Sequence, residues 1–136
     1  MTEERPPALD PALVQPFVAK AHGDLDAVRE LLEQEPQLVN AAWDWGGGDW
    51  ETGLGAASHM GRRDIAACLL EAGARMDIFA AAMLGETEIV RAMLTAHPEM
   101  RDARGPHGIP LVKHAEMGGA QAREVLELLE REEAKA

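Results

Sequence analysis

The chain has 136 residues, and 46% of them are hydrophobic, enough for one globular domain with a packed core. Thirteen basic residues stand against 24 acidic ones, and the net charge of −11 argues against nucleic acid or anionic membrane as a partner. A single Cys excludes an internal disulfide and a multi-cysteine metal site, and no apolar run is long enough for a membrane span. The first 11 residues are acidic and proline-rich, unlike a signal peptide, so we expect a cytoplasmic protein.

The aromatic residues are few and gathered in one place. They make up 4% of the chain, there is no Tyr, and all three Trp lie between residues 43 and 50. A core with so few aromatic residues must be built from Leu, Ala, Val, Ile and Met, which favours helix–helix packing over packed sheets. The composition therefore predicts an all-α fold.

The predicted helices come in pairs. Residues 1–10 are expected to be flexible. Asp10 followed by Pro11 predicts a helix start, because an N-cap with proline in the first turn opens a run of apolar residues at helical spacing. A second helix is expected over residues 24–34. Three further pairs, each joined by glycine, are predicted over residues 56–60 and 64–72, 78–84 and 87–96, and 111–117 and 121–132.

The second pair carries the clearest motif. It contains, in order, Thr52-x-Leu54, Ala57-Ser58, Gly61, Asp64-Ile65, Leu69-Leu70 and Gly73-Ala74. This pattern resembles the ankyrin repeat, whose consensus begins T-P-L-H-x-A-A and closes on L-L-L-x-x-G-A. The resemblance extends over residues 14–130 and is weaker in the terminal pairs. It implies an ankyrin-repeat solenoid of about four helix pairs, one domain over residues 11–132 with a flexible tail over 133–136.

The spacing between pairs departs from the ankyrin period at two places. The link between the first and second pairs is longer than standard by about five residues. The excess lies in Trp43–Glu51, W-D-W-G-G-G-D-W-E, which predicts a long Trp-rich loop. The link between the second and third pairs is shorter by about nine residues, which leaves no room for the usual β-hairpin finger.

The resemblance also implies where a partner would bind. Ankyrin proteins usually bind partners in the concave groove formed by the inner helices and the loops beside them. The groove and loop residues expected to bind a ligand here are Trp43, Asp44, Trp45, Trp50, Met83, Lys113, His114 and Glu116. Since Trp is strongly enriched in binding hot spots, the leading hypothesis is a module that recognises a protein partner through the groove and the Trp43–Glu51 loop.

The same region supports an alternative hypothesis. Asp49 and Glu51 offer carboxylates and His59 and His107 offer imidazoles, next to the three Trp. A carboxylate–imidazole pair in a desolvated pocket suits acid–base chemistry. The alternative is therefore a cofactor-independent small enzyme or small-molecule binder that uses these four residues as its catalytic set. A purely structural or oligomerising unit is the third possibility, in which the Trp residues only plug the end of the groove.

The sequence does not predict a metal centre. Asp49, Glu51, His59 and His107 together could hold an ion, but they show none of the spacings typical of metal sites, so neither a metal nor another cofactor is expected. His22 stands just before a helix-breaking glycine, where a solvated cap is expected rather than a ligand. The identity of the partner and the oligomeric state do not follow from these residues.

Overall fold

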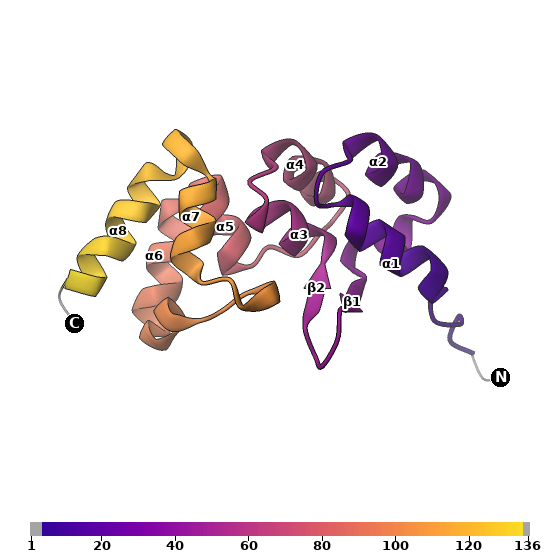
Figure 1. Ribbon diagram of the computed structural model, residues 1–136, viewed down its shortest axis with the longest axis horizontal. Helices are drawn as coiled ribbons and strands as arrows, with labels where there is room; N and C mark the ends of the chain where they lie inside the picture. The colour runs from indigo at the N-terminus through magenta and orange to yellow at the C-terminus, as the bar shows by residue number, and fades with distance from the viewer. Residues whose placement is uncertain (1–3, 135–136) are drawn as a thin grey trace.

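The computed structural model describes residues 4–134 of the chain. They form a mostly helical domain with one two-stranded antiparallel hairpin. The helices follow one another in pairs along the long axis, and the hairpin projects beside α1 and α3, away from α2 and α4 (Figure 1). The helices are α1 (Pro11–Lys20), α2 (Leu25–Gln34), α3 (Gly53–His59), α4 (Arg63–Glu71), α5 (Ile78–Leu84), α6 (Thr87–Ala96), α7 (Leu111–Met117) and α8 (Arg123–Ala134).

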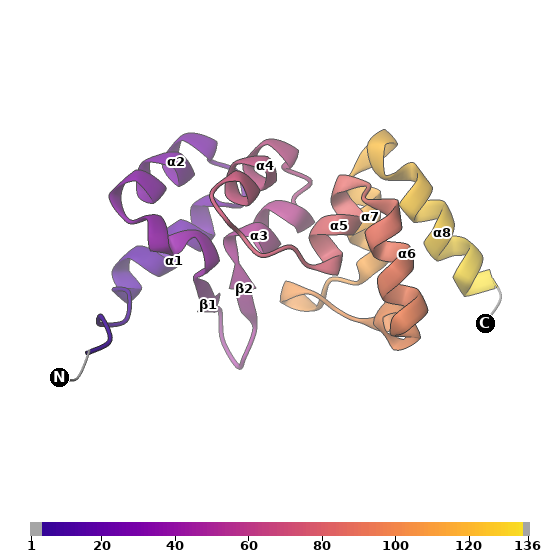
Figure 2. The ribbon, with the colours of Figure 1, turned by 180° about the vertical axis from the view of Figure 1, so that it is seen from behind.

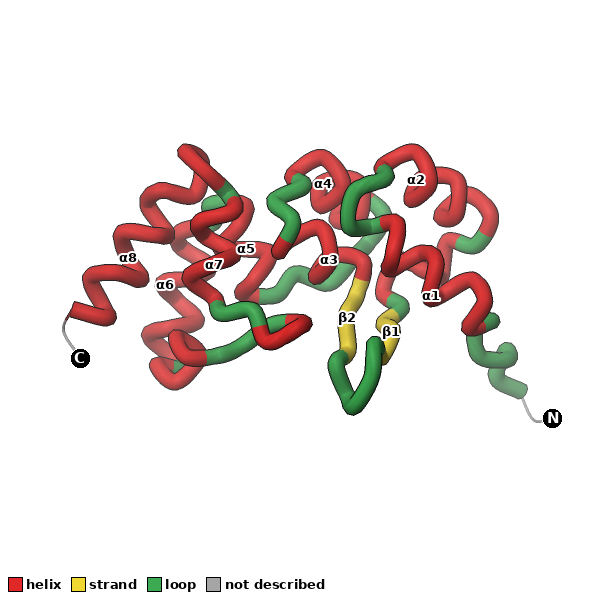
Figure 3. The backbone as a smooth tube through the Cα atoms, viewed as in Figure 1, coloured by secondary structure: helices red, strands yellow, loops and turns green. Residues whose placement is uncertain are grey.

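The hairpin corrects the prediction of a purely helical fold with a long loop. Strands β1 (Ala42–Asp44) and β2 (Trp50–Thr52) pair antiparallel within the segment expected to be irregular (Figure 3). Carboxylate oxygens of Asp44 accept hydrogen bonds from the backbone N–H groups of Gly46 at 2.8 Å and Gly48 at 3.0 Å, and both glycines have positive φ. Strands of only three residues are too short to show an alternating pattern in the sequence.

Side-chain caps explain where the first helices begin. Asp10 caps α1, as predicted, and Asp24 caps α2, which therefore begins at Leu25, one residue after the predicted start. Thr52 Oγ1 accepts a hydrogen bond from the Gly55 N–H at 3.0 Å, so α3 begins at Gly53, ahead of the predicted residue 56. Among the described residues, no helix combines the length and the apolar character that a membrane span requires.

The two ends of the chain fall partly within the described residues. Residues 4–10, part of the segment expected to be flexible, have no regular secondary structure. Helix α8 continues to Ala134, past the predicted domain end at residue 132. Residues 1–3 and 135–136, which complete the two expected flexible segments, lie outside the described residues.

The core consists of two clusters of apolar side chains. The first, which includes Phe17, Leu54 and Leu69, is built mainly from the first two helix pairs. The second, which includes Leu111 and Val125, is built from the last two pairs. The inner helices α1, α3, α5 and α7 contact one another in succession, so the two clusters share one continuous row of helices. The polar site described below spans both halves of this row.

Two consecutive arginines fasten neighbouring helix pairs together. Arg62 Nη1 donates to the carbonyl oxygen of Gly23 at 2.8 Å, in the turn of the first pair. Arg63 donates through Nη1 to the Leu84 carbonyl at 2.9 Å and through Nη2 to the Met83 carbonyl at 3.0 Å. The last carbonyl oxygens of a helix have no partner within the helix, so these guanidinium groups satisfy them from an adjacent pair.

We expect Arg63→Met to lower the free energy of unfolding by about 2 kcal/mol, because hydrogen bonds from a charged donor are lost while the carbonyl acceptors remain partly buried. Urea unfolding followed by circular dichroism measures the difference. Arg29→Met is the matched control, since Arg29 is exposed and lies on the outer helix α2. Equal unfolding midpoints for the two variants would contradict this role of Arg63.

Candidate functional site

The centre of the site is a buried carboxylate on strand β2. Side chains alternate along the strand, so Trp50 points outward and is 61% exposed, whereas Glu51 points inward and is 1% exposed. Trp45 Nε1 donates a hydrogen bond to Glu51 Oε1 at 2.8 Å. A carboxylate buried away from water needs hydrogen-bond donors of this kind, because burying an unpaired charge is very costly.

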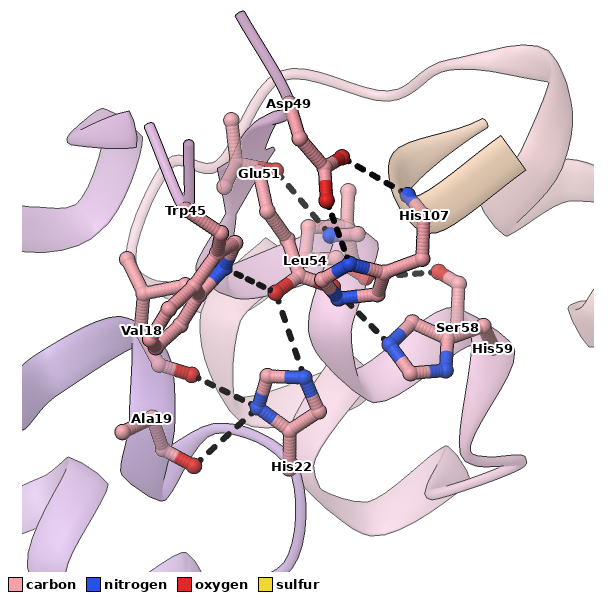
Figure 4. Close-up of polar contacts among 12 residues, drawn as sticks. Val18, Ala19, His22, Trp45, Asp49, Glu51, Leu54, Ser58, His59 and His107 are labelled. Carbon is pink, nitrogen blue, oxygen red and sulfur yellow. Dashed lines mark hydrogen bonds and ion pairs between the residues drawn. The ribbon is translucent and has the colours of Figure 1, made fainter. Parts of the chain in front are cut away.

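Three histidine rings from different parts of the chain meet this carboxylate (Figure 4). His59, the last residue of α3, places Nε2 2.8 Å from Glu51 Oε2. His22, in the turn after α1, places Nε2 3.1 Å from Oε1, and His107, in the short 3-10 segment Pro106–Gly108, places Nε2 3.3 Å from Oε2. One ligand atom from each of the four residues lies within 4.8 Å of all the others. His22, Glu51, His59 and His107 are referred to below as the His–Glu cluster.

The contacts of His22 Nδ1 determine which tautomer the neutral ring adopts. Nδ1 lies 3.0 Å from the Val18 carbonyl oxygen and 3.1 Å from that of Ala19, both at the end of α1. Carbonyl oxygens only accept hydrogen bonds, so in a neutral ring the proton is on Nδ1. The lone pair is then on Nε2, which faces the centre of the cluster.

His107 is oriented in the same way by Asp49. One carboxylate oxygen of Asp49 accepts the backbone N–H of His107 and the other faces Nδ1, both at 2.7 Å. His107 has a φ of +63°, a left-handed conformation that is uncommon for residues other than glycine and is held only where surrounding contacts impose it. The hairpin tip therefore stabilises a strained loop and turns its imidazole Nε2 toward Glu51.

Electrostatic effects within the site favour ionised carboxylates. Burial raises the pKa of Glu51, but hydrogen bonds from His22, His59 and Trp45 and the charge of His22 outweigh it and lower this pKa to about 2. The hydrogen bond to Glu51 raises the pKa of His22, against the opposing effect of burial. The backbone N–H of His107 lowers the pKa of Asp49. The ionised carboxylates of Glu51 and Asp49 therefore face imidazole nitrogens.

The structure brings together all four residues proposed from the sequence as an acid–base set. Asp49, Glu51, His59 and His107 form one connected network of contacts. His22 was expected only as a cap; its Nδ1 does face carbonyl oxygens at the end of α1, but its Nε2 also contacts Glu51, which sequence reasoning missed. A signal was available, because His22 and His59 both stand at the end of an inner helix, beside the turn glycine of consecutive pairs.

Of four further residues expected in the groove, two are buried and two are exposed on α7. Met83 is fully buried in the core. Asp77 caps α5 only eight positions before the turn glycine, whereas Thr52 caps α3 nine positions before its own, so the position equivalent to His59 is Leu84 and Met83 is rotated inward by about 100°. Lys113 and Glu116 on α7 pair with each other at 3.6 Å on the surface, and His114 is fully buried.

The remaining loop residues have separable roles. Asp44 forms the hairpin turn, and Trp45 donates to Glu51. Trp43 packs partly against the first core cluster. Trp43, Asp44 and Trp50 also line a cavity of about 270 Å³ beside the N-terminal end of α1. Of the three indoles, Trp45 therefore belongs to the candidate site, and Trp50 is the one most exposed to solvent.

His114 provides a test of pH dependence outside the cluster. Its ring packs on Phe79, Nδ1 faces the Pro110 carbonyl oxygen at 3.0 Å, and buried Nε2 has no partner among the described residues. Burial lowers the pKa of His114, so below the unfolded value of 6.5 the unfolded chain binds more protons. The free energy of unfolding contributed by this residue is therefore full above pH 6.5 and falls as the pH drops below it.

We expect His114→Asn to flatten this pH dependence while keeping a donor for the Pro110 carbonyl. Urea unfolding of chelator-treated protein at several pH values between about 7.5 and 5 measures the slope, which should be smaller for the variant. His97→Asn is the control, since His97 is exposed. Parallel profiles for wild type and His114→Asn would show that buried His114 does not carry this effect.

Comparison with known proteins does not add to this picture: no family model matches the chain, and no curated protein sequence matches it. The chemistry of the site must therefore be inferred from its donor atoms. Three imidazole nitrogens and one carboxylate oxygen form a ligand set that suits borderline divalent ions such as Zn²⁺, Ni²⁺ and Co²⁺ rather than Mg²⁺ or Ca²⁺. The four residues of the His–Glu cluster are those that could hold such an ion.

Proposed function

We propose that the protein binds one divalent transition-metal ion through the His–Glu cluster. The observation that carries this proposal is the convergence of the four donor atoms within 4.8 Å of one another. Ligands placed about 2.1 Å from a tetrahedral ion lie about 3.4 Å apart. The closest approaches in the cluster, between 2.8 and 3.3 Å, and its outer limit of 4.8 Å bracket that spacing, so only small side-chain movements are required.

The outer contacts of the rings support the same proposal. Metal-binding histidines usually donate their second ring N–H to a carbonyl or a carboxylate, which fixes the tautomer and the ring orientation. His22 has carbonyl partners for this purpose and His107 has Asp49. In the neutral tautomer with the proton on Nδ1, the Nε2 lone pair of each ring is available to a metal ion, which would take the place of the hydrogen bond that His22 otherwise donates to Glu51.

Hydrogen bonding makes the cofactor-independent alternative less suitable. A general base must have a free lone pair within reach of the substrate proton. Both oxygens of Glu51 are already in contact with ring nitrogens, and Oε1 also accepts from Trp45. Both oxygens of Asp49 are occupied by His107. These contacts make the two carboxylates poor general bases, and we favour metal binding because it uses the imidazole nitrogens together with Glu51.

The scaffold that carries this site is, in our proposal, a short ankyrin-repeat stack. Support comes from the repeat-like motif of the second pair, the succession of contacting inner helices and a hairpin that projects between the first two pairs. Thr52 and Asp77 also cap consecutive inner helices in the same way, each accepting the backbone N–H of the residue three positions later. These matches between successive helix pairs support the proposed scaffold, but a fold alone does not define a function.

Metal titration of chelator-stripped protein tests the proposed function. We expect saturable binding of one Zn²⁺ or Co²⁺ per chain by calorimetry, visible absorption bands of bound Co²⁺, and no comparable binding of Mg²⁺. His59→Ala should abolish the Co²⁺ bands, whereas His97→Ala, at an exposed histidine outside the cluster, should keep them. Absence of saturable binding below about 100 µM Zn²⁺, or equal binding by both variants, would overturn the proposal.

Recognition of a protein partner through the groove and the Trp43–Glu51 loop is the second candidate function. It is favoured by the 61% exposure of Trp50 and by the cavity beside it, whose walls include Leu9, Val14 and Trp43. Trp50→Ala separates the two functions, because Trp50 does not belong to the cluster. The variant should retain its metal affinity and, where Trp50 anchors a partner, lose about 2 kcal/mol of binding to that partner.

A further inference from the structure

A second cavity adjoins the cluster, and its walls come from both halves of the molecule. Its volume is about 370 Å³. The hairpin tip contributes Gly48, Asp49 and Trp50, and the loop before α7 contributes Arg104, Gly105 and Pro106. Figure 2 shows this loop reaching from the C-terminal half toward β2, as in Figure 1. The shape of the cavity therefore depends on how the loop is held against the hairpin.

Hydrogen bonds within this loop set its shape. Within it, the backbone N–H of Gly105 donates to the Ile109 carbonyl at 2.8 Å, and Arg104 Nη1 donates to the Gly108 carbonyl at 2.9 Å. These bonds shape the loop but do not join it to the hairpin. His107 makes that connection, through Asp49 and through Glu51.

We propose that the metal ion acts as a strap that closes this loop onto the hairpin and so forms the cavity between them. This inference rests on the proposed function, because His107 is the one cluster residue that comes from the loop, while Glu51 comes from the hairpin and His59 from α3. A bond from the ion to His107 Nε2 ties the loop to the first half of the chain. Asp49 acts on the other ring nitrogen and on the backbone, as a positioning residue.

The left-handed backbone of His107 makes the strap reversible. Holding a residue other than glycine in that region costs on the order of 1 kcal/mol, which the contacts of the closed loop must offset. When the ion leaves, only the contacts of His107 with Asp49 and Glu51 hold the loop to the hairpin against this cost. The loop then opens more often, and the cavity loses one of its walls when it does.

Limited trypsin digestion of the full chain measures this coupling. Trypsin can cleave after Arg104, in the loop, and after Arg75, in the exposed link between α4 and α5, which does not contribute to the cluster. Mass spectrometry gives the rate of each cleavage with saturating Zn²⁺ and with chelator. Because any bound ion slows digestion globally, the quantity compared is the Arg104 rate divided by the Arg75 rate.

We expect Zn²⁺ to lower this ratio by more than about tenfold in the wild type, since cleavage requires local opening of the loop. His107→Ala removes the one cluster residue that comes from the loop and keeps His22, Glu51 and His59, so Zn²⁺ at saturating concentration should give the variant little protection at Arg104. Zn²⁺ binding, confirmed by calorimetry, with an unchanged ratio in the wild type would overturn the strap and leave the metal site standing. Equal protection in both proteins would also overturn it, and absence of Zn²⁺ binding would overturn both proposals.

Discussion

Replacing Glu51 with glutamine is expected to lower the affinity for Zn²⁺ by more than about 100-fold, or about 2.7 kcal/mol. Glutamine has the size of glutamate and keeps an oxygen that can accept the Trp45 indole N–H. It carries no charge, so the ion would lose the one anionic residue of the cluster. Calorimetric titration of the chelator-stripped variant measures the change, and its circular dichroism spectrum reports whether the fold is retained.

Glu86→Gln is the matched control, since Glu86 is exposed and lies outside the cluster. It removes the same charge from the chain and should leave the Zn²⁺ affinity within about twofold, because exposed charges act weakly at a distance in salt. If both variants bound Zn²⁺ as the wild type does, Glu51 would not be a ligand. Trp45→Phe is an intermediate case, because it removes only the indole donor to Glu51, and we expect a loss of about tenfold.

The helices could be predicted from the sequence because their signals are local. Asp10 with Pro11 marks the start of α1, and α5 and α7 have the bounds that their apolar spacing predicts. The hairpin was not predicted, because each strand has only three residues and its pairing is determined by the turn that Asp44 and three glycines form. Boundaries set by a cap were missed for a similar reason: Thr52 starts α3 earlier than the apolar pattern indicates.

Part of the candidate site was predicted from the sequence, whereas the metal binding that we propose for it was not. The sequence places Asp49 and Glu51 in one segment, and the resemblance to a repeat stack brings His59 near them. The convergence of His22 on the same carboxylate depends on the packing of α1 against α3, which no short motif records. Ligands drawn from four separate segments lack the fixed spacing by which metal motifs are recognised.

Met83 and His107 show how a local feature of the backbone decides whether a side chain reaches the site. Met83 was expected in the groove because it follows the Ala-Ala pair of the repeat motif, but the cap at Asp77 shifts α5 by one residue and turns the side chain into the core. His107 reaches Glu51 only because its backbone adopts a positive φ that a histidine rarely takes. Neither effect has a signature in composition or periodicity.

Removal of the metal ion is expected to lower the thermal stability of the whole domain. An ion that binds only the folded state stabilises it by about 2.7 kcal/mol when its free concentration is 100 times the dissociation constant. For a domain of this size that corresponds to roughly 10 °C in Tm. His22 belongs to the first helix pair and His107 to the loop before the fourth, so the ion joins segments that pack against different core clusters. Both halves should therefore unfold in one transition with Zn²⁺ bound.

Differential scanning calorimetry with free Zn²⁺ and with chelator measures this effect directly. The wild type should show the full decrease in Tm on chelation, whereas Glu51→Gln should show little change, because its weaker affinity leaves little stabilisation by Zn²⁺ at the same concentration. The comparison also separates binding from stabilisation. If the wild type bound one Zn²⁺ and its Tm did not move, the ion would have to bind the unfolded chain equally well, and the four donors could not be preorganised as the structure places them.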